Sequence, residues 1–368
     1  MSSPYIYVNA SLPRHFNPPQ ISANVEIELG ALRNLLSRND VAITVDDEGK
    51  LEQRILSIFT HDEVMFGDPG FIPANRKAWL ERISLFTEQR KPIEFVAMAF
   101  PYKVPNPLKT DRQAPDAGEA LMLRRFQAVL DAIATIYEPG GRLTILEEGI
   151  LGRCQGVPAS RVAAYRAGID QVVALAGVDR DRVTFHSLDD MTTQIPNFEA
   201  RWIHEQERLR ELWQQNDPVV REAYATTVAA QRTSVPTWDY EPAVLVEAYD
   251  SEKTDSALRY PRDYIDKVAH RQFFAYRSLL ALRDSSGYLH ALRPFALKLT
   301  VSPKPENLAV VPVNTWSRIL PYHGVAVMDA GGRWTIQYRA AIGAEFGPVE
   351  ALHLVGDDDP APIAYRVV

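Results

Sequence analysis

Polar side chains gather in one proline-rich stretch, residues 101–119, with the sequence PYKVPNPLKTDRQAPDAGE. Five of its residues could act on a ligand: Lys103, Asn106, Lys109, Asp116 and Glu119. Lysine ammonium groups bind phosphate and carboxylate oxygens, and an asparagine amide donates hydrogen bonds to the same oxygens. The prolines restrict the backbone, so these side chains lose less entropy on binding. The stretch is therefore predicted to be an anion-binding loop.

A second interpretation of the same residues stays open. Lys103 and Lys109 are also typical of solvated loop lysines. Asp116 and Glu119 stand where a helix is predicted to begin, and carboxylates at that position cap free N–H groups and favour the positive end of the helix dipole.

Two further predicted strands end in charged residues. Glu147 and Glu148 follow one strand, and His186 closes the other. In an open α/β sheet, ligands bind outside the carboxyl ends of the strands. These residues are therefore expected near Lys103 and Lys109, in a mixed charge set that suits an anionic, polar small molecule.

Other candidate residues are scattered. His323 precedes an apolar strand in LPYHGVAV, and the adjacent Gly324 allows close approach to its backbone. His323 is either a proton carrier or a histidine that only hydrogen-bonds at a strand start. Arg271 and Arg277 either face solvent or clamp a phosphate group.

Several classes of site are not predicted. No two histidines stand at metal-ligand spacing, and the single cysteine, Cys154, excludes an internal disulfide and a multi-cysteine metal site. Glycine-rich nucleotide motifs, a GxSxG elbow and an HExxH pair are absent.

Composition narrows the class further. The chain has 368 residues and a formal net charge of -7, which does not favour nucleic acid or an anionic membrane as a partner. No apolar stretch approaches the roughly 18 residues that span a bilayer, and the N-terminus lacks a secretory pattern. A cytoplasmic protein is expected.

The elements that position these residues alternate between strand and helix. Strands are predicted at 93–100, 142–146 and 182–185, with helices at 79–90, 118–137 and 160–177 between them. This alternation is typical of parallel strands joined by crossover helices. The predicted fold class is α/β, with a Rossmann-like, open, mostly parallel sheet and helices on both faces.

The flanking regions complete the predicted organisation. Residues 195–285 are mainly helical in pattern, and the C-terminal strands form either an antiparallel extension of the sheet or a smaller neighbouring domain. Residues 1–75 are predicted to be an N-terminal arm with a small α/β subdomain, which includes a helical pattern at 25–38 and a strand at 41–45. A glycine and proline cluster separates them from a catalytic domain at 76–368.

Several motifs resemble the isonitrile (isocyanide) synthase family of the pyoverdine/dityrosine biosynthesis type. The similar elements are the strand ending AFPYK, the NP and KT of the loop, PDAGE and its helix, IYEPGG, and a strand closing on an acidic residue and glycine. A later segment with a turn at Ser302-Pro303 and the strand HGVA is similar too. The resemblance covers roughly residues 78–345.

The resemblance implies a function in natural-product biosynthesis. Members of this family convert the α-amino group of an amino acid to an isonitrile, with ribulose 5-phosphate as the carbon donor and without a metal or redox cofactor. An amino acid and a sugar phosphate are therefore the expected substrates, and a downstream oxygenase of the same pathway is an expected partner.

Roles for individual residues follow as hypotheses. Glu148, His323 and Lys103 are expected to be catalytic. The expected substrate-binding residues are Asn106, Lys109, Asp116, Glu119, Arg271, Arg277 and Ser302.

Two departures from the family pattern leave alternatives open. The chain has Glu147-Glu148-Gly149 where the family has Ser-Asp-Gly, and Ser302-Pro303 where His-Pro is common. A divergent member could instead perform N-acylation or oxidation of an amino acid, or act as a non-catalytic binding protein.

Overall fold

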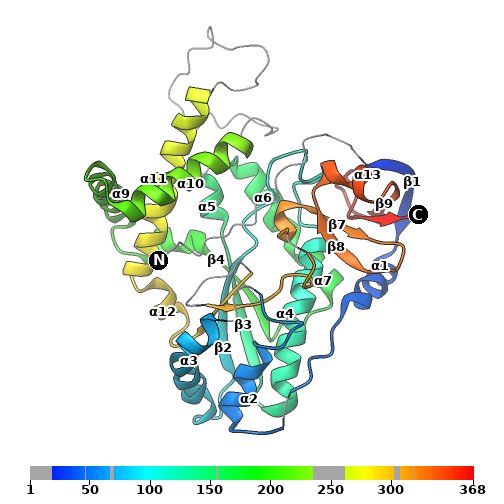
Figure 1. The fold of residues 1–368 in the computed structure, drawn as a ribbon, viewed down its shortest axis with the longest axis horizontal. Helices are drawn as coiled ribbons and strands as arrows, with labels where there is room; N and C mark the ends of the chain where they lie inside the picture. The colour runs from blue at the N-terminus through cyan, green and yellow to red at the C-terminus, as the bar shows by residue number, and fades with distance from the viewer. Residues whose placement is uncertain are drawn as a thin grey trace.

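The structure is a computed structural model that describes residues 19–45, 47–66, 70–154, 156–234, 262–301, 307–317 and 319–368. Ser302 and residues 1–18 of the predicted arm lie outside the described residues. Figure 1 shows a central sheet with a helical layer at the left and a second sheet at the right.

The central sheet is fully parallel. Its strands are β2 (Ile93–Ala99), β3 (Gly141–Glu147), β4 (Val183–Ser187), β5 (Leu297–Thr300) and β6 (Leu308–Ala309). The spatial order is β4-β3-β2-β5-β6, so the strand order reverses between β2 and β5. A crevice at such a reversal, outside the carboxyl ends of the strands, is the usual ligand site of this fold. The predicted fold class is confirmed.

Both faces of this sheet are covered by helices, because side chains alternate along each strand. Phe95 and Ala97 pack into one hydrophobic cluster, and Val96 packs into another. Helices of the first cluster are α1 (Leu29–Leu36), α2 (Leu51–Ile58), α3 (Phe71–Thr87), α4 (Ala117–Ile136), α6 (Ala159–Ala167) and α7 (Ile169–Ala176). Helices of the second are α5 (Gly149–Cys154), α8 (Met191–Gln194), α9 (Phe198–Gln214), α11 (Arg262–Ser285) and α12 (Tyr288–Leu292).

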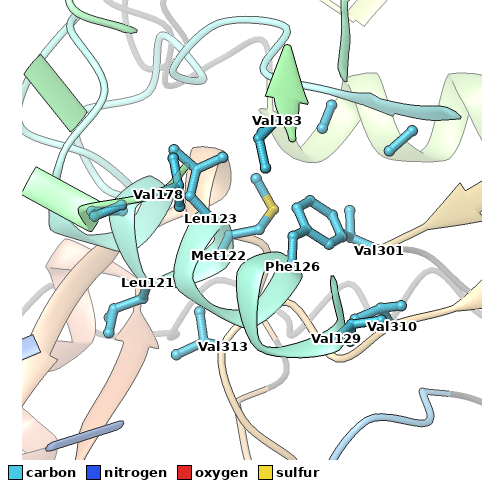
Figure 2. Close-up of a cluster of buried hydrophobic side chains, with 14 of the residues drawn as sticks. Leu121, Met122, Leu123, Phe126, Val129, Val178, Val183, Val301, Val310 and Val313 are labelled. Carbon is cyan, nitrogen blue, oxygen red and sulfur yellow. The ribbon is translucent and has the colours of Figure 1, made fainter. Parts of the chain in front are cut away.

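Helix α4 is the most buried of the helices that position the loop. Met122 and Phe126 point from α4 toward Val183 and Val301 (Figure 2), and the side chains of all four are nearly or fully buried. The three- and four-residue spacing of its apolar residues predicted this helix within one residue at each end.

A second, mixed sheet joins the two ends of the described chain. It contains β1 (Gln20–Ile27), β7 (Val325–Met328), β8 (Trp334–Gln337), β9 (Pro348–Leu354) and β10 (Ala364–Val367), in the order β1-β9-β10-β7-β8. β1 pairs in parallel with β9, so blue and red strands lie side by side in Figure 1. The predicted hairpin turn at residues 329–334 joins the antiparallel strands β7 and β8. The first two predicted C-terminal strands, β5 and β6, thus join the parallel sheet, whereas the later ones lie in this second sheet.

The remaining elements are short, apart from α10. They are η1 (Ser37–Asn39), η2 (Leu188–Asp190), α10 (Pro218–Ser234), η6 (Pro321–His323), η7 (Arg339–Ala341) and α13 (Ile342–Glu345). Helices α9, α10 and α11 pack on one another, as the helical pattern at 195–285 predicted for its described part.

Three local predictions are wrong. Val25–Ile27 continue β1 rather than a helix, because pairing with β9 outweighs their helical spacing. Residues 41–45 form no strand. The predicted helix 160–177 divides at Gly168, where Cδ of Pro115 would lie only 2.7 Å from an added Cβ. The boundary predicted near residue 75 stays a prediction, although one hydrophobic cluster includes residues from both sides of it.

No helix among the described residues combines the length and the hydrophobicity that crossing a bilayer would require.

Candidate functional site

The loop between β2 and α4 leaves the carboxyl edge of the parallel sheet next to the strand reversal. It begins at Phe100, which adopts a left-handed backbone conformation with φ of 56°. The Phe100 ring packs on Tyr165 and Phe185. This turn directs the chain across the edge of the sheet, toward the N-terminus of α4.

Lys103 lies in a buried network at the start of this loop. Its Nζ atom is 2.8 Å from Oδ2 of Asp116 and 2.9 Å from Oε2 of Glu119. Nζ also donates to the carbonyl oxygens of Pro321 at 2.7 Å and of Gly324 at 3.1 Å. Only 1% of the Lys103 side chain is exposed. Four oxygens from the protein itself therefore surround this ammonium group.

Asp116 and Glu119 form the capping box that begins α4. Oδ1 of Asp116 accepts from the backbone N–H of Gly118, and Oε2 of Glu119 accepts from the backbone N–H of Asp116. The capping interpretation of these residues is confirmed. Tyr165 donates its hydroxyl to Oε1 of Glu119 at 3.1 Å. Burial raises the pKa of Glu119 to about 7, against the opposing effect of Lys103.

Asn106 and Lys109 lie in one tight turn in the middle of the loop. The backbone N–H of Lys109 donates to the Asn106 carbonyl at 2.8 Å, and Oδ1 of Asn106 accepts from the N–H of Leu108 at 3.0 Å. The Lys109 ammonium lies 5.1 Å from the centre of the Tyr338 ring, a cation–π distance. Burial lowers the pKa of Lys109.

His323 closes the 3-10 turn η6 beside both lysines. Burial and the positive charges of Lys109 and Lys103 lower its pKa to about 3, so its imidazole is neutral at ordinary pH. The close approach expected at Gly324 is to β8, because an added Cβ would lie 2.7 Å from the Gln337 carbonyl oxygen. Lys103, Lys109, Asp116, Glu119 and His323 thus come together.

A second polar cluster lies at the ends of β3 and β4. Nε of Arg166 donates to Glu147 at 2.7 Å, and its Nη2 contacts Ser187 at 2.9 Å and Asp189 at 3.1 Å. Nε2 of His186 lies 3.2 Å from the Tyr288 hydroxyl. The pairing register aligns Ala99, Glu147 and Ser187 at the same edge.

A narrow hollow lies beside the second cluster. It is lined by Phe100, Pro101, Glu147, Gly149, Val162, Tyr165, Arg166 and Ile169. Its walls leave no room for a water molecule in this conformation. Tyr165 belongs to both its lining and the Glu119 contact, and so joins the clusters.

Three further predicted residues are Glu148, Arg271 and Arg277. Glu148 is partly buried. Burial raises the pKa of the Tyr102 phenol, and the charges of Glu148 and Cys154 raise it further. Arg271 is exposed and Arg277 is partly exposed on α11. Helix α11 covers the opposite face of the sheet from α4. The structure therefore does not bring the two arginines to the lysines.

Sequence reasoning missed Tyr165, Arg166 and Tyr338. None of the three directly follows a parallel strand at the carboxyl edge, so the sequence pattern did not mark them. Their side chains reach the site from α6 and from the end of β8.

The second sheet holds the loop in place. The N–H of Val104 donates to the carbonyl of Tyr322 at 3.0 Å, and the N–H of Arg339 donates to the carbonyl of Lys109 at 3.2 Å. Asp111 pairs with Arg339 and accepts from the Tyr365 hydroxyl at 2.7 Å. Burial raises the pKa of Asp111. Arg112 contacts Asp357 at 2.8 Å and Asp359 at 3.5 Å.

Known proteins are similar to this chain over a range that includes the loop and strands β2, β3 and β4. A family profile described as pyoverdine/dityrosine biosynthesis protein matches residues 83–245. An L-tryptophan isonitrile synthase of Fischerella ambigua is 32% identical over 39% of this chain, and the match spans only 42% of that relative. An L-tyrosine isonitrile synthase of Pseudomonas aeruginosa is 28% identical over 72% of this chain and 77% of its own length.

A solved structure supports the same fold. The crystal structure of the PvcA protein from Pseudomonas aeruginosa matches with a TM-score of 0.67 and 22% identity. The match covers 87% of this chain and all of that one. The parallel sheet, its helices and the second sheet therefore form an arrangement that a known protein shares.

Proposed function

Because the chain belongs to the pyoverdine/dityrosine biosynthesis type of isonitrile synthase family, we propose that it converts the α-amino group of an amino acid to an isonitrile. Ribulose 5-phosphate is the proposed carbon donor, and its C2 atom becomes the isonitrile carbon. The observation that carries the proposal is the similarity to relatives named as isonitrile synthases for L-tryptophan and L-tyrosine.

The chemistry begins with an amine and a ketone. Imine formation and the later carbon–carbon cleavage both require proton transfers at positioned groups. The pKa of His323, lowered to about 3, makes its imidazole a weak base that passes on readily any proton it accepts, and we propose it as a proton carrier. Glu148 is the second proposed proton carrier, at the carboxyl end of β3.

Lys103 has a different proposed role from the one expected from sequence. Its ammonium contacts four protein oxygens, so binding a substrate anion would require displacing Asp116 or Glu119. We assign Lys103 to positioning the loop and the start of α4. Lys109 remains the proposed anion-binding lysine.

Glu147, which stands where the family pattern has serine, forms an ion pair in this structure. Its carboxylate is held by Arg166, which also contacts Ser187 and Asp189. Glu147 thus lies in an ion-pair cluster on α6 and β4, which leaves Glu148 as the carboxylate proposed for the reaction.

The test is incubation of the purified protein with ribulose 5-phosphate labelled with ¹³C at C2 and each of the twenty amino acids in turn. A tetrazine traps the isonitrile, and mass spectrometry detects the label. The expected result is a labelled adduct with at least one amino acid and a strong loss of product in His323→Gln. No adduct with any amino acid would overturn the proposal.

A further inference from the structure

The amide nitrogen of Asn106 lacks a hydrogen-bond acceptor among the residues that the structure describes. Asn106 is 1% exposed, so its amide is removed from bulk solvent. The orientation of the amide is fixed, because Oδ1 accepts from the N–H of Leu108 and Nδ2 cannot do so. A buried donor of this kind is costly unless something accepts from it.

Lys109 lies three residues away in the same turn and also lacks an acceptor. It is 7% exposed, and within the described parts of the chain no carboxylate lies within ion-pair distance of its ammonium. The Tyr338 ring at 5.1 Å is the contact that its charge makes. Two donors in one turn, one of them a fully buried amide, therefore face no carboxylate among the described residues.

The other cations near this turn are neutralised. Lys103, Arg112 and Arg339 each form an ion pair with at least one carboxylate. The Lys103 network has two carboxylates for one ammonium, so it contributes no surplus positive charge. Of these four cations, Lys109 is the one whose charge no described carboxylate balances.

We infer that Asn106 and Lys109 bind the carboxylate group of the amino-acid substrate, and that the sugar phosphate binds elsewhere. A carboxylate carries one negative charge, which one ammonium balances, and its two oxygens match the two unpartnered donors. The assignment to an amino acid rests on the proposed function. The preference for a carboxylate rests on the charges alone.

A phosphate dianion fits this turn less well. Its second charge would lack a cation, because Lys103, Arg112 and Arg339 already pair with carboxylates. The neutral His323 adds a hydrogen bond but no charge. The turn is also already ordered, because Lys109 is held at both its N–H and its carbonyl.

The experiment measures equilibrium binding of ligands to the full chain, without turnover. Since both side chains are covered, binding requires a local opening of the loop, and calorimetry is run to equilibrium. The ligands are the twenty amino acids, the amino alcohols matched to those that bind, acetate, ribulose 5-phosphate and inorganic phosphate. The variants are Lys109→Met and Asn106→Asp, with Lys77→Met as the control because Lys77 is 92% exposed.

Asn106→Asp is the sharper of the two variants. It keeps an oxygen for the N–H of Leu108 and adds a carboxylate to the turn, where it takes the place of the ligand. We expect it to fold and to lose amino-acid binding, while ribulose 5-phosphate binding stays within about twofold.

The remaining variants and the wild type have expected results of their own. Lys109→Met weakens amino-acid binding by about tenfold or more, Lys77→Met changes nothing, and the wild type binds amino acids more tightly than their amino alcohols. The inference is overturned if the variants lose ribulose 5-phosphate or phosphate instead. It is equally overturned if neither acetate nor any amino acid binds. Lysine-dependent carboxylate binding without isonitrile formation would reject the proposed function and keep this inference.

Discussion

Lys103 and Lys109 are the same residue type, six positions apart in one loop, and both are buried. Lys103 contacts two carboxylates and two carbonyl oxygens of the protein. Lys109 contacts the face of Tyr338 and no described carboxylate. The charge of Lys103 is therefore balanced by described carboxylates, whereas the charge of Lys109 is available to a ligand.

The difference teaches that burial alone does not identify a binding residue. A buried charge costs free energy unless it is paired, so what matters is where its partner comes from. The partners of Lys103 come from the start of α4 and from η6, whereas no described residue supplies a carboxylate for Lys109. Each of the following changes tests one side of this contrast.

The largest effect is expected from Lys103→Met. The substitution leaves Asp116 and Glu119 buried without their cation, which should lower the free energy of unfolding by about 3 to 5 kcal/mol. Urea denaturation measures the change. Adding Glu119→Gln to Lys103→Met should restore part of the loss, and a single-variant loss below about 1 kcal/mol would show that the network is not structural.

Glu119 should make stability depend on pH in a defined window. The folded state raises the pKa of Glu119 from 4.5 to about 7, so between these values the folded chain holds a proton that the unfolded chain releases. The free energy of unfolding should therefore fall as pH rises through this window, by an amount on the order of 3 kcal/mol, and stay level above it.

His323 acts in the opposite direction, so the Glu119 term must be isolated. The lowered pKa of His323 makes stability rise with pH between about 3 and 6.5. Denaturation of the wild type and Glu119→Gln at matched pH values removes the common histidine term. A difference between the two proteins that does not change from pH 4.5 to 8 would contradict the assignment.

Tyr365→Phe should loosen the Lys109 side of the loop. The phenol donates to Asp111, whose other oxygen pairs with Arg339, and the backbone of Arg339 holds the Lys109 carbonyl. We expect a loss of about 1 kcal/mol in unfolding free energy and weaker amino-acid binding. Tyr338→Phe keeps the ring under Lys109 and is the matched control. Equal losses of amino-acid binding in both variants would argue against a role for the Tyr365–Asp111–Arg339 contacts.

Lys109→Met should have the smallest effect on stability. It removes an unpaired buried ammonium and keeps an apolar stem, so the free energy of unfolding should stay unchanged or rise by up to about 1 kcal/mol. Denaturation beside Lys103→Met gives the direct comparison. A loss as large as that of Lys103→Met would show that the protein itself supplies a partner for Lys109.

The sequence by itself determined the parallel sheet and the start of α4. Apolar runs at 93–100 and 142–146, separated by a 20-residue amphipathic helix, allow few arrangements other than a crossover between parallel strands. The place of Asp116 and Glu119 at the predicted helix start offered capping as an alternative to substrate binding, because capping depends on residues within one turn. These features are local, or depend on periodicity.

Only the tertiary structure decided which of the two lysines is surrounded by oxygens of the protein. The oxygens that surround Lys103 include the carbonyls of Pro321 and Gly324, more than 200 residues away, and backbone carbonyls carry no sequence signal. β1 was likewise mispredicted because its partner, β9, lies at the other end of the chain. A charge is balanced by whatever lies within a few ångströms of it, and that distance is set by the packing of the second sheet against the loop.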